Sequence, residues 1–249
     1  MKLLGIFTWL LLGFAGSAVA ADEPRFSLVR TAQTLTQGDF AWRNGGWQQP
    51  PPIDHIAVLV EHRGSRLLFG TGLGRQIDAQ LDAEVPWRIK RYGPVHAVRD
   101  QLQRDGLHID RILLGCARWE HASGLADFPD VPVFASAESR RYIRGATPPA
   151  VLPSQFQHAV NWQPLQFMAK PYLGYAESLD LFGDGRLVLV PLAGHGAVGL
   201  FLTLGDGRRF FFRGDTLGHP ATPHEQAGVV PSSDARMQAS LGVYPAWVQ

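Results

Sequence analysis

The sequence is poor in cysteine, in net charge and in long apolar runs. Its 249 residues include one cysteine, Cys116, so an intramolecular disulfide is excluded. The formal net charge is +1, which gives no broad field for nucleic acid or acidic lipid. After the first 20 residues, no apolar run reaches the roughly 20 residues that a membrane-spanning helix needs. We therefore expect a core-stabilised protein with no nucleic-acid partner and no membrane anchor.

The N-terminus has the pattern of an export signal. Lys2 supplies a positive charge, residues 3–14 are mostly apolar, and Ala18-Val19-Ala20 closes the segment with small residues. This order is typical of a cleavable secretory signal, and the apolar run is too short to span a bilayer. We expect residues 1–20 to be a signal peptide, residues 21–249 to be a single domain, and the mature chain to be periplasmic or secreted.

The expected mature chain is predicted to consist mainly of strands. Helical spacing occurs at 95–107, and a polar helix is expected at 136–144. Residues 43–52, with paired glycines and three prolines, are expected to be a loop, and 145–164 has no clear pattern. Short polar or Gly-Asp-Gly breaks indicate hairpins between several of the expected strands, which are 25–36, 53–61, 66–69, 109–114, 131–135, 178–182, 186–190, 200–204 and 208–213. This order predicts an α/β protein with mixed sheets and outer helices.

The residues after the strand at 109–114 carry the most specific pattern. They have the form Cys116-x-Arg118-x-Glu120-His121-x-x-Gly124, and Pro-Leu-Ala-Gly-His at 191–195 and Gly-Asp at 214–215 come later, each after a strand. In these segments the chain resembles the metallo-β-lactamase superfamily, whose motif is His-x-His-x-Asp-His-x-x-Gly. The resemblance implies an αββα sandwich of two mixed sheets with outer helices and a site at one sheet edge.

The resemblance also implies where two zinc ions would be held. The first metal would face Cys116, Arg118 and His195, the second would face Glu120, His121 and Trp247, and Asp215 would bridge them. His121, His195 and Asp215 keep the family residue, whereas Cys116, Arg118, Glu120 and Trp247 are altered ligand positions. Gly70 stands where the family has an early aspartate.

Arg118 is the alteration with the largest physical consequence. Its guanidinium is permanently charged, so it would place a cation where a dication belongs. Two unit charges 4 Å apart repel by about 4 kcal/mol near a protein surface, and a dication doubles this repulsion. The same cation could pair instead with Glu120 or Asp215. We therefore expect an arginine–carboxylate network in place of the first zinc.

Three hypotheses about the chemistry stay open at this point. In the first, the chain binds a small molecule in the sheet-edge pocket without family-type dinuclear zinc hydrolysis and needs no cofactor. In the second, it is a lactonase-like or esterase-like hydrolase with one zinc ion on His121, His195, Asp215 and tentatively Cys116. Glu120 or Asp215 would then orient the water. In the third, Cys116 is a nucleophile with His121 or His195 as its base, although an unreactive cysteine is the simpler interpretation.

Overall fold

The computed structural model describes residues 22–34, 41–43, 46–48, 54–86, 92–214, 229–230 and 240–249. The signal peptide expected at 1–20 and Asp215 therefore lie outside the described residues. Within the described residues, no helix is both long enough and apolar enough to cross a membrane.

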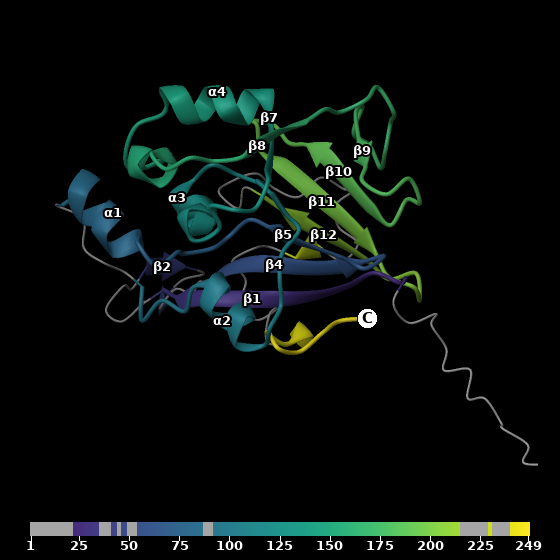
Figure 1. Ribbon diagram of the computed structural model, residues 1–249, viewed down its shortest axis with the longest axis horizontal. Helices are drawn as coiled ribbons and strands as arrows, with labels where there is room; N and C mark the ends of the chain where they lie inside the picture. Colours follow the sequence, from purple (N-terminus) through teal and green to yellow (C-terminus); the bar gives the residue numbers. More distant parts are fainter. Residues whose placement is uncertain are drawn as a thin grey trace, which may run out of the picture.

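A six-stranded sheet forms the first layer (Figure 1). Its strands, in spatial order, are β1 (Arg25–Gln33), β4 (Asp54–His62), β5 (Ser65–Phe69), β6 (Arg111–Leu113), β7 (Val133–Ser136) and β8 (Trp162–Leu165). The pairings β1–β4 and β4–β5 are antiparallel, whereas β5 to β8 run parallel. The C-terminal ends of β5, β6 and β7 therefore share one edge, which we call the site edge.

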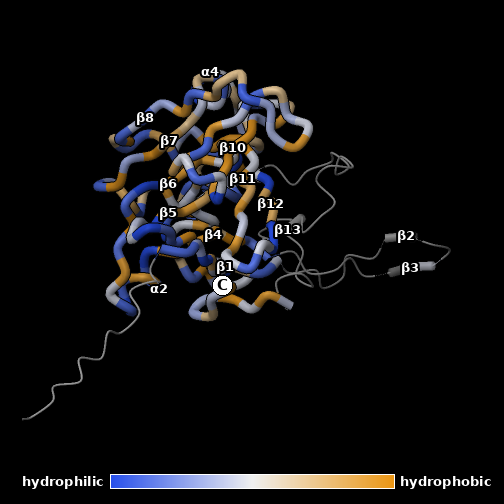
Figure 2. The backbone as a smooth tube through the Cα atoms, turned by 90° about the vertical axis from the view of Figure 1, so that its right-hand side faces the viewer, coloured by the Kyte–Doolittle hydropathy of each residue, from blue (hydrophilic) through white to orange (hydrophobic). Residues whose placement is uncertain are grey.

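A second sheet packs against the first. It contains β13 (Val229–Val230), β12 (Arg209–Arg213), β11 (Val198–Thr203), β10 (Leu187–Pro191) and β9 (Leu179–Asp180), in that order. Only the β12–β13 pair is parallel, so both sheets are mixed, as predicted. Apolar residues of both sheets meet in one shared core, with Phe26 edge-on to Phe210 and Phe212 at ring distances of 4.8 and 5.1 Å. Figure 2 shows the hydrophobic stretches that β10, β11 and β12 contribute.

The described helices are α1 (Ile77–Glu84), α2 (Val98–Arg104), α3 (Trp119–Ala122) and α4 (Ala137–Gly145), with the 3-10 turns η2 (Ser123–Asp127) and η3 (Pro153–Phe156). Helices α2, α3 and α4 cover the outer face of the six-stranded sheet, whereas α1 lies beyond the ends of its strands (Figure 1). The helix expected at 95–107 is the shorter α2, because His96 donates its backbone N–H to Thr31 O and Ala97 is extended. In the described part of the chain, the outer face of the second sheet is covered by residues 172–175.

One local prediction was wrong, and one stretch for which no element was predicted contains two. Residues 43–52 are not all loop, since β2 (Ala41–Arg43) pairs with β3 (Gly46–Gln48) as a separate hairpin. The unpatterned stretch 145–164 contains η3 and the start of β8. A proline inside β8, Pro164, removes a backbone donor and is compatible with a strand only because β8 is at the edge of its sheet.

The C-terminal residues cover the outer side of β1, the strand at the opposite side of the six-stranded sheet from β8. Phe26 and Val248 exchange two backbone hydrogen bonds of 3.0 and 2.8 Å, and Tyr244 N donates to Leu28 O. Ser27 Oγ also donates to Ala246 O at 2.6 Å. Residues 244–248 therefore form a strap along β1, in which each of these polar groups has a partner.

Candidate functional site at the sheet edge

Backbone hydrogen bonds join the loops at the site edge. Gly70, which comes directly after β5, donates to Leu113 O at 2.9 Å, and Thr71 N donates to His121 O at 2.8 Å. In the second sheet, Val198 N donates to Gly115 O at 2.8 Å and Gly214 N donates to Val198 O at 2.9 Å. The motif loop after β6 is thus fixed to both sheets.

The approach of the two sheets at this edge requires glycine. A Cβ at Gly214 would lie 2.0 Å from Gly115 O, and one at Gly115 would lie 2.7 Å from the Phe69 ring. These distances are far inside van der Waals contact, so the Gly-Asp segment and the motif loop can touch only without side chains. This explains the Gly115 and Gly214 positions in packing terms.

A small pocket opens between the two sheets at the site edge. Its volume of about 10 Å³ holds roughly one water molecule. Its walls are partly apolar and partly polar, and the lining residues are Ile56, Val58, Phe69, Gly70, Gly115, Cys116, His121, Phe212, Arg213 and Gly214. The structure therefore brings together Cys116 and His121 of the predicted site residues. It adds Arg213, which sequence reasoning missed although it directly precedes the Gly-Asp segment.

Arg118 and Glu120 form an ion pair beside this pocket. Arg118 Nη2 and Glu120 Oε1 are 3.0 Å apart, and Arg118 Nε and Glu120 Oε2 are 3.4 Å apart. Their side chains are 25% and 20% exposed. The guanidinium thus contacts both carboxylate oxygens, and a pair of this bidentate kind is stronger than a single contact. This is one of the two pairings expected for Arg118, and it occupies the carboxylate that the second metal would need.

His195 points toward α4 instead of lining the pocket. Its ring stacks on Tyr142, with centroids 4.3 Å apart and an angle of 27° between planes, and the residue is exposed. The reason is the loop that carries it. Gly196 is so close to α4 that a Cβ would lie 2.1 Å from Ser139 N, and Ser136 Oγ donates to Gly196 O. His195 itself has a φ of +58°, a value uncommon outside glycine.

Trp247 lies at the opposite end of the sheet. The Arg25 guanidinium stacks over its ring at 4.3 Å, and Arg25 pairs with Glu61 near the β4–β5 turn. The pocket is at the other end of β5, where Phe69 leads into Gly70. The structure therefore does not bring Trp247 to the predicted ligand set.

One carboxyl near the site edge has a shifted pKa. Burial raises the pKa of Asp127, and the Arg75 backbone N–H, which donates to its Oδ2 at 3.1 Å, and the Arg75 charge only partly oppose this. The contact connects η2 to the turn that precedes α1. Asp127 thus anchors the loop at the end of β5, and it does not line the pocket.

The described donors do not fit a family-type pair of metal ions. Among them, no three His, Cys, Asp or Glu side chains converge. His121 and Cys116 line the pocket, but Glu120 is paired with Arg118, and His195 stacks on Tyr142. A zinc site of this family needs three or more ligands for each ion.

No protein-family model and no curated protein matches the sequence, so the comparison rests on solved structures. One similar structure is an N-acyl homoserine lactone hydrolase with its product N-hexanoyl-L-homoserine at the catalytic metal centre. It has a TM-score of 0.65 and 12% identity over 91% of this chain and 100% of that one. A quorum-quenching N-acyl homoserine lactone lactonase has a TM-score of 0.59 and 12% identity, over 92% and 98% of the chains.

A probable metal-dependent hydrolase from Staphylococcus aureus is also similar, with a TM-score of 0.54 and 12% identity over 88% of this chain and 82% of that one. At such low identity these matches establish the fold alone. The two mixed sheets, the outer helices and the motif loop at the site edge agree with it. The chain therefore has the metallo-β-lactamase fold, which it shares with the N-acyl homoserine lactone hydrolases.

Proposed function

We propose that this protein binds a small molecule at the site edge and does not carry out family-type dinuclear zinc hydrolysis. The observation that carries the proposal is the Arg118–Glu120 ion pair, with its 3.0 Å contact in the centre of the metal motif. Arg118 supplies a fixed positive charge at a position where the family motif has a metal-binding histidine, and Glu120 neutralises it. To bind zinc on the Glu120 carboxylate, the protein would have to break this pair and accept the repulsion between the ion and Arg118.

The position of His195 supports the same proposal independently. A metal bound by His121 and His195 would require the His195 ring to leave Tyr142, on which it stacks with centroids 4.3 Å apart. Polarisation of a carbonyl by a dinuclear centre needs both ions in place. Because the pocket itself holds about one water molecule, we place the ligand at its mouth, next to the lining residues Cys116, His121 and Arg213.

A mononuclear or altered-mechanism hydrolase acting on a lactone or ester is the second candidate. It is favoured by one observation, that Cys116 and His121 both line the pocket. In that case His121, with Cys116, Asp215 or a repositioned His195, would hold one zinc ion. The ion would polarise the carbonyl, and Glu120 or Asp215 would orient the water. We also propose export to the periplasm or the medium, on the basis of residues 1–20.

Metal content by elemental analysis, before and after zinc loading, separates the two candidates. The purified protein should stay below one zinc per chain. The variant Cys116→His/Arg118→His restores two family ligands and should take up more zinc than the unaltered chain. It serves as the positive control, because its zinc uptake shows that the assay can detect a metal site in this fold. Stoichiometric zinc in the unaltered protein, lost in His195→Ala, would overturn the proposal and support the hydrolase candidate.

A further inference from the structure

The near-zero total charge conceals a local excess of positive charge on α4. This helix carries Arg140, Arg141 and Arg144 in exposed or half-exposed positions, with Glu138 as its one acidic residue. Many other described arginines lie in ion pairs, for example Arg75 with Asp100. Within the described residues, no ion pair joins an α4 arginine to a carboxylate.

The arrangement on α4 costs stability unless an anion is nearby. Arg141 and Arg144 are three positions apart and Arg140 and Arg144 are four apart, so all three guanidiniums lie on adjacent parts of the helix surface. Like charges at these spacings destabilise a helix. Arg144 is in the last turn, where the helix dipole favours a cation, and Arg140 stacks over Trp162, whereas Arg141 has only Glu138, three positions earlier, as an acidic residue on its own helix.

An exposed apolar side chain, Met168, lies on the same side of the molecule as α4. We call the surface formed by α4 and residues 166–177 the flank. The Arg140 guanidinium stacks over the Trp162 ring at 5.6 Å, which places α4 against β8, the last strand of its sheet. The chain continues from β8 into Met168, which is 56% exposed, and then into exposed Lys170. In the described part of the chain, Met168 is the one large hydrophobic residue exposed to this degree. Figure 1 shows α4 and the segment between β8 and β9 along the same side of the molecule, at the top of the view.

We propose that this flank docks on an anionic lipid surface, with the α4 arginines and Lys170 over the headgroups and Met168 inserted among them. Juxtaposed basic residues and a shallow apolar contact are what peripheral attachment to such a surface requires. A protein interface would instead need an apolar core, and this flank offers a single exposed apolar side chain. Glu138 and Glu177 are the acidic residues of the flank, and both are exposed. They only partly neutralise the three α4 arginines and Lys170, so the flank keeps a net positive charge. The inference is independent of the chemistry at the site edge.

Vesicle co-sedimentation tests the proposal with the full chain. Vesicles of equal parts phosphatidylglycerol and phosphatidylcholine should bind the protein more strongly than phosphatidylcholine alone, and added salt should weaken the binding. The variant Arg141→Gln/Arg144→Gln should lower the partition coefficient about twenty-fivefold, at about fivefold for each arginine. The control Arg104→Gln/Arg209→Gln removes the same charge from exposed positions on α2 and β12 and should keep the binding. The apolar N-terminal residues are common to all variants, so they cancel in the ratios.

Three results would overturn the proposal. The first is equal binding to both kinds of vesicle. The second is an α4 variant that, with an unchanged unfolding temperature, binds like the control. The third is α4-dependent binding of glycerol phosphate or of polyglutamate without binding to vesicles, which would identify a soluble anion or an acidic protein as the partner. Met168→Gln adds an independent check, because it should weaken vesicle binding without changing the salt dependence.

Discussion

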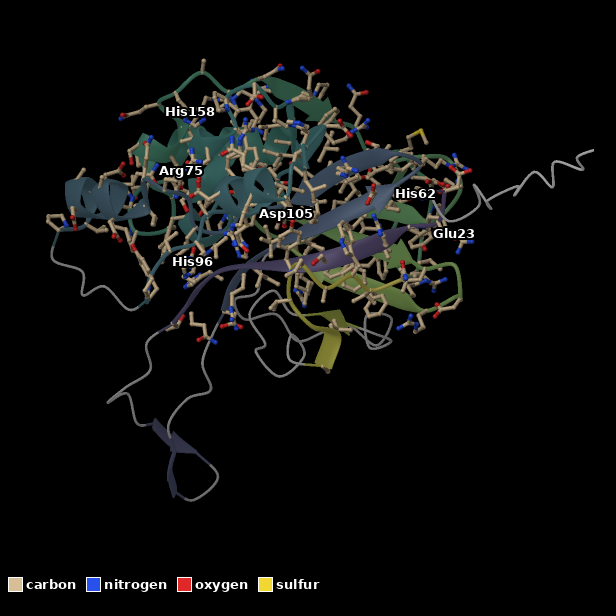
Figure 3. All side chains as sticks on the ribbon, turned by 60° about the horizontal axis from the view of Figure 1, so that its bottom comes forward. Glu23, His62, Arg75, His96, Asp105 and His158 are labelled. Carbon is tan, nitrogen blue, oxygen red and sulfur yellow. The ribbon has the colours of Figure 1, made fainter. Side chains whose placement is uncertain are left out.

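Asp184 joins the two sheets at the end opposite the pocket, and its removal should destabilise the protein measurably. Its Oδ2 lies 2.7 Å from His62 Nε2 and 3.1 Å from Arg63 Nη2, and its Oδ1 accepts the Arg186 backbone N–H at 3.0 Å. Figure 3 shows His62 at the end of the sheets far from Arg75, which comes after β5 at the site edge. The His62 side chain is 3% exposed and that of Asp184 is 17% exposed, so the contact is largely shielded from water.

The size of the effect of Asp184→Asn can be worked out from these contacts. Asparagine has one acceptor oxygen, so it keeps the Arg186 contact and turns its NH₂ group toward His62. A buried hydrogen bond to a charged group contributes about 1.5–3 kcal/mol, whereas the half-exposed Arg63 adds little. We expect the free energy of unfolding to fall by about 2 kcal/mol. For a domain of this size, that lowers the unfolding temperature by about 4–8 °C.

The loss should also depend on pH. Burial of Asp184 disfavours its charged form, but the hydrogen bonds from His62 and Arg186 and the nearby charges outweigh this effect, so its pKa lies below the ordinary value of 3.8. A lowered carboxyl pKa stabilises the fold above the ordinary value, and the stabilisation disappears as the pH falls through the folded-state pKa. The difference between the unaltered protein and Asp184→Asn should therefore be full near neutral pH and shrink below pH 3.8.

Urea unfolding of both proteins across this pH range measures the difference directly. Asp206→Asn is the matched control, because Asp206 also lies between two glycines in a hairpin turn. Its side chain bonds to Arg208, a near neighbour in the same turn, and it is exposed, so its loss should leave the free energy of unfolding nearly unchanged. Equal effects of the two substitutions, or a loss at Asp184 that persists unchanged at low pH, would refute the reasoning.

Two further predictions concern the site edge and the strap. Gly196→Ala should destabilise the protein by about 3 kcal/mol or more, because its Cβ would overlap Ser139 N and its φ is +70°, whereas Gly145→Ala, with open space around it, should be neutral in thermal unfolding. Burial and the hydrogen bond to Asp105 raise the pKa of Tyr244 to about 12, so one tyrosine should ionise late in an absorbance titration. Tyr244→Phe should abolish that late phase, and an unchanged titration would contradict the assignment.

Much of the fold was predictable because its signals are local. The hairpins around 62–65 and 205–207 are indicated by polar turns between apolar runs, and both are confirmed. Helix α1 was not predicted, since Ile77 and Leu81 are the only apolar residues that it buries. Strand β8 was hidden by Pro164 and by the absence of alternation. Its place in the sheet is set by pairing with β7, a contact between segments about thirty residues apart.

The candidate site was predictable in composition but only partly in geometry. Spacing indicated Cys116, Arg118, Glu120 and His121, and the structure places the first and last of these in the pocket. The direction of His195 depends on how Gly196 packs against α4, which no local pattern encodes. Trp247 was misplaced because the C-terminal residues run along β1 to its far end.

The strap along β1 has a consequence for how the chain folds. The first strand is completed by residues 244–248, more than two hundred positions later, so its outer edge stays open until the last part of the chain is available. Contacts of such long range form slowly, and an open strand edge is a template for pairing with another chain. A chain that lacks residues 244–248 would therefore retain both sheets but expose the edge of β1 to other molecules. Such a chain should self-associate while its pocket stays intact.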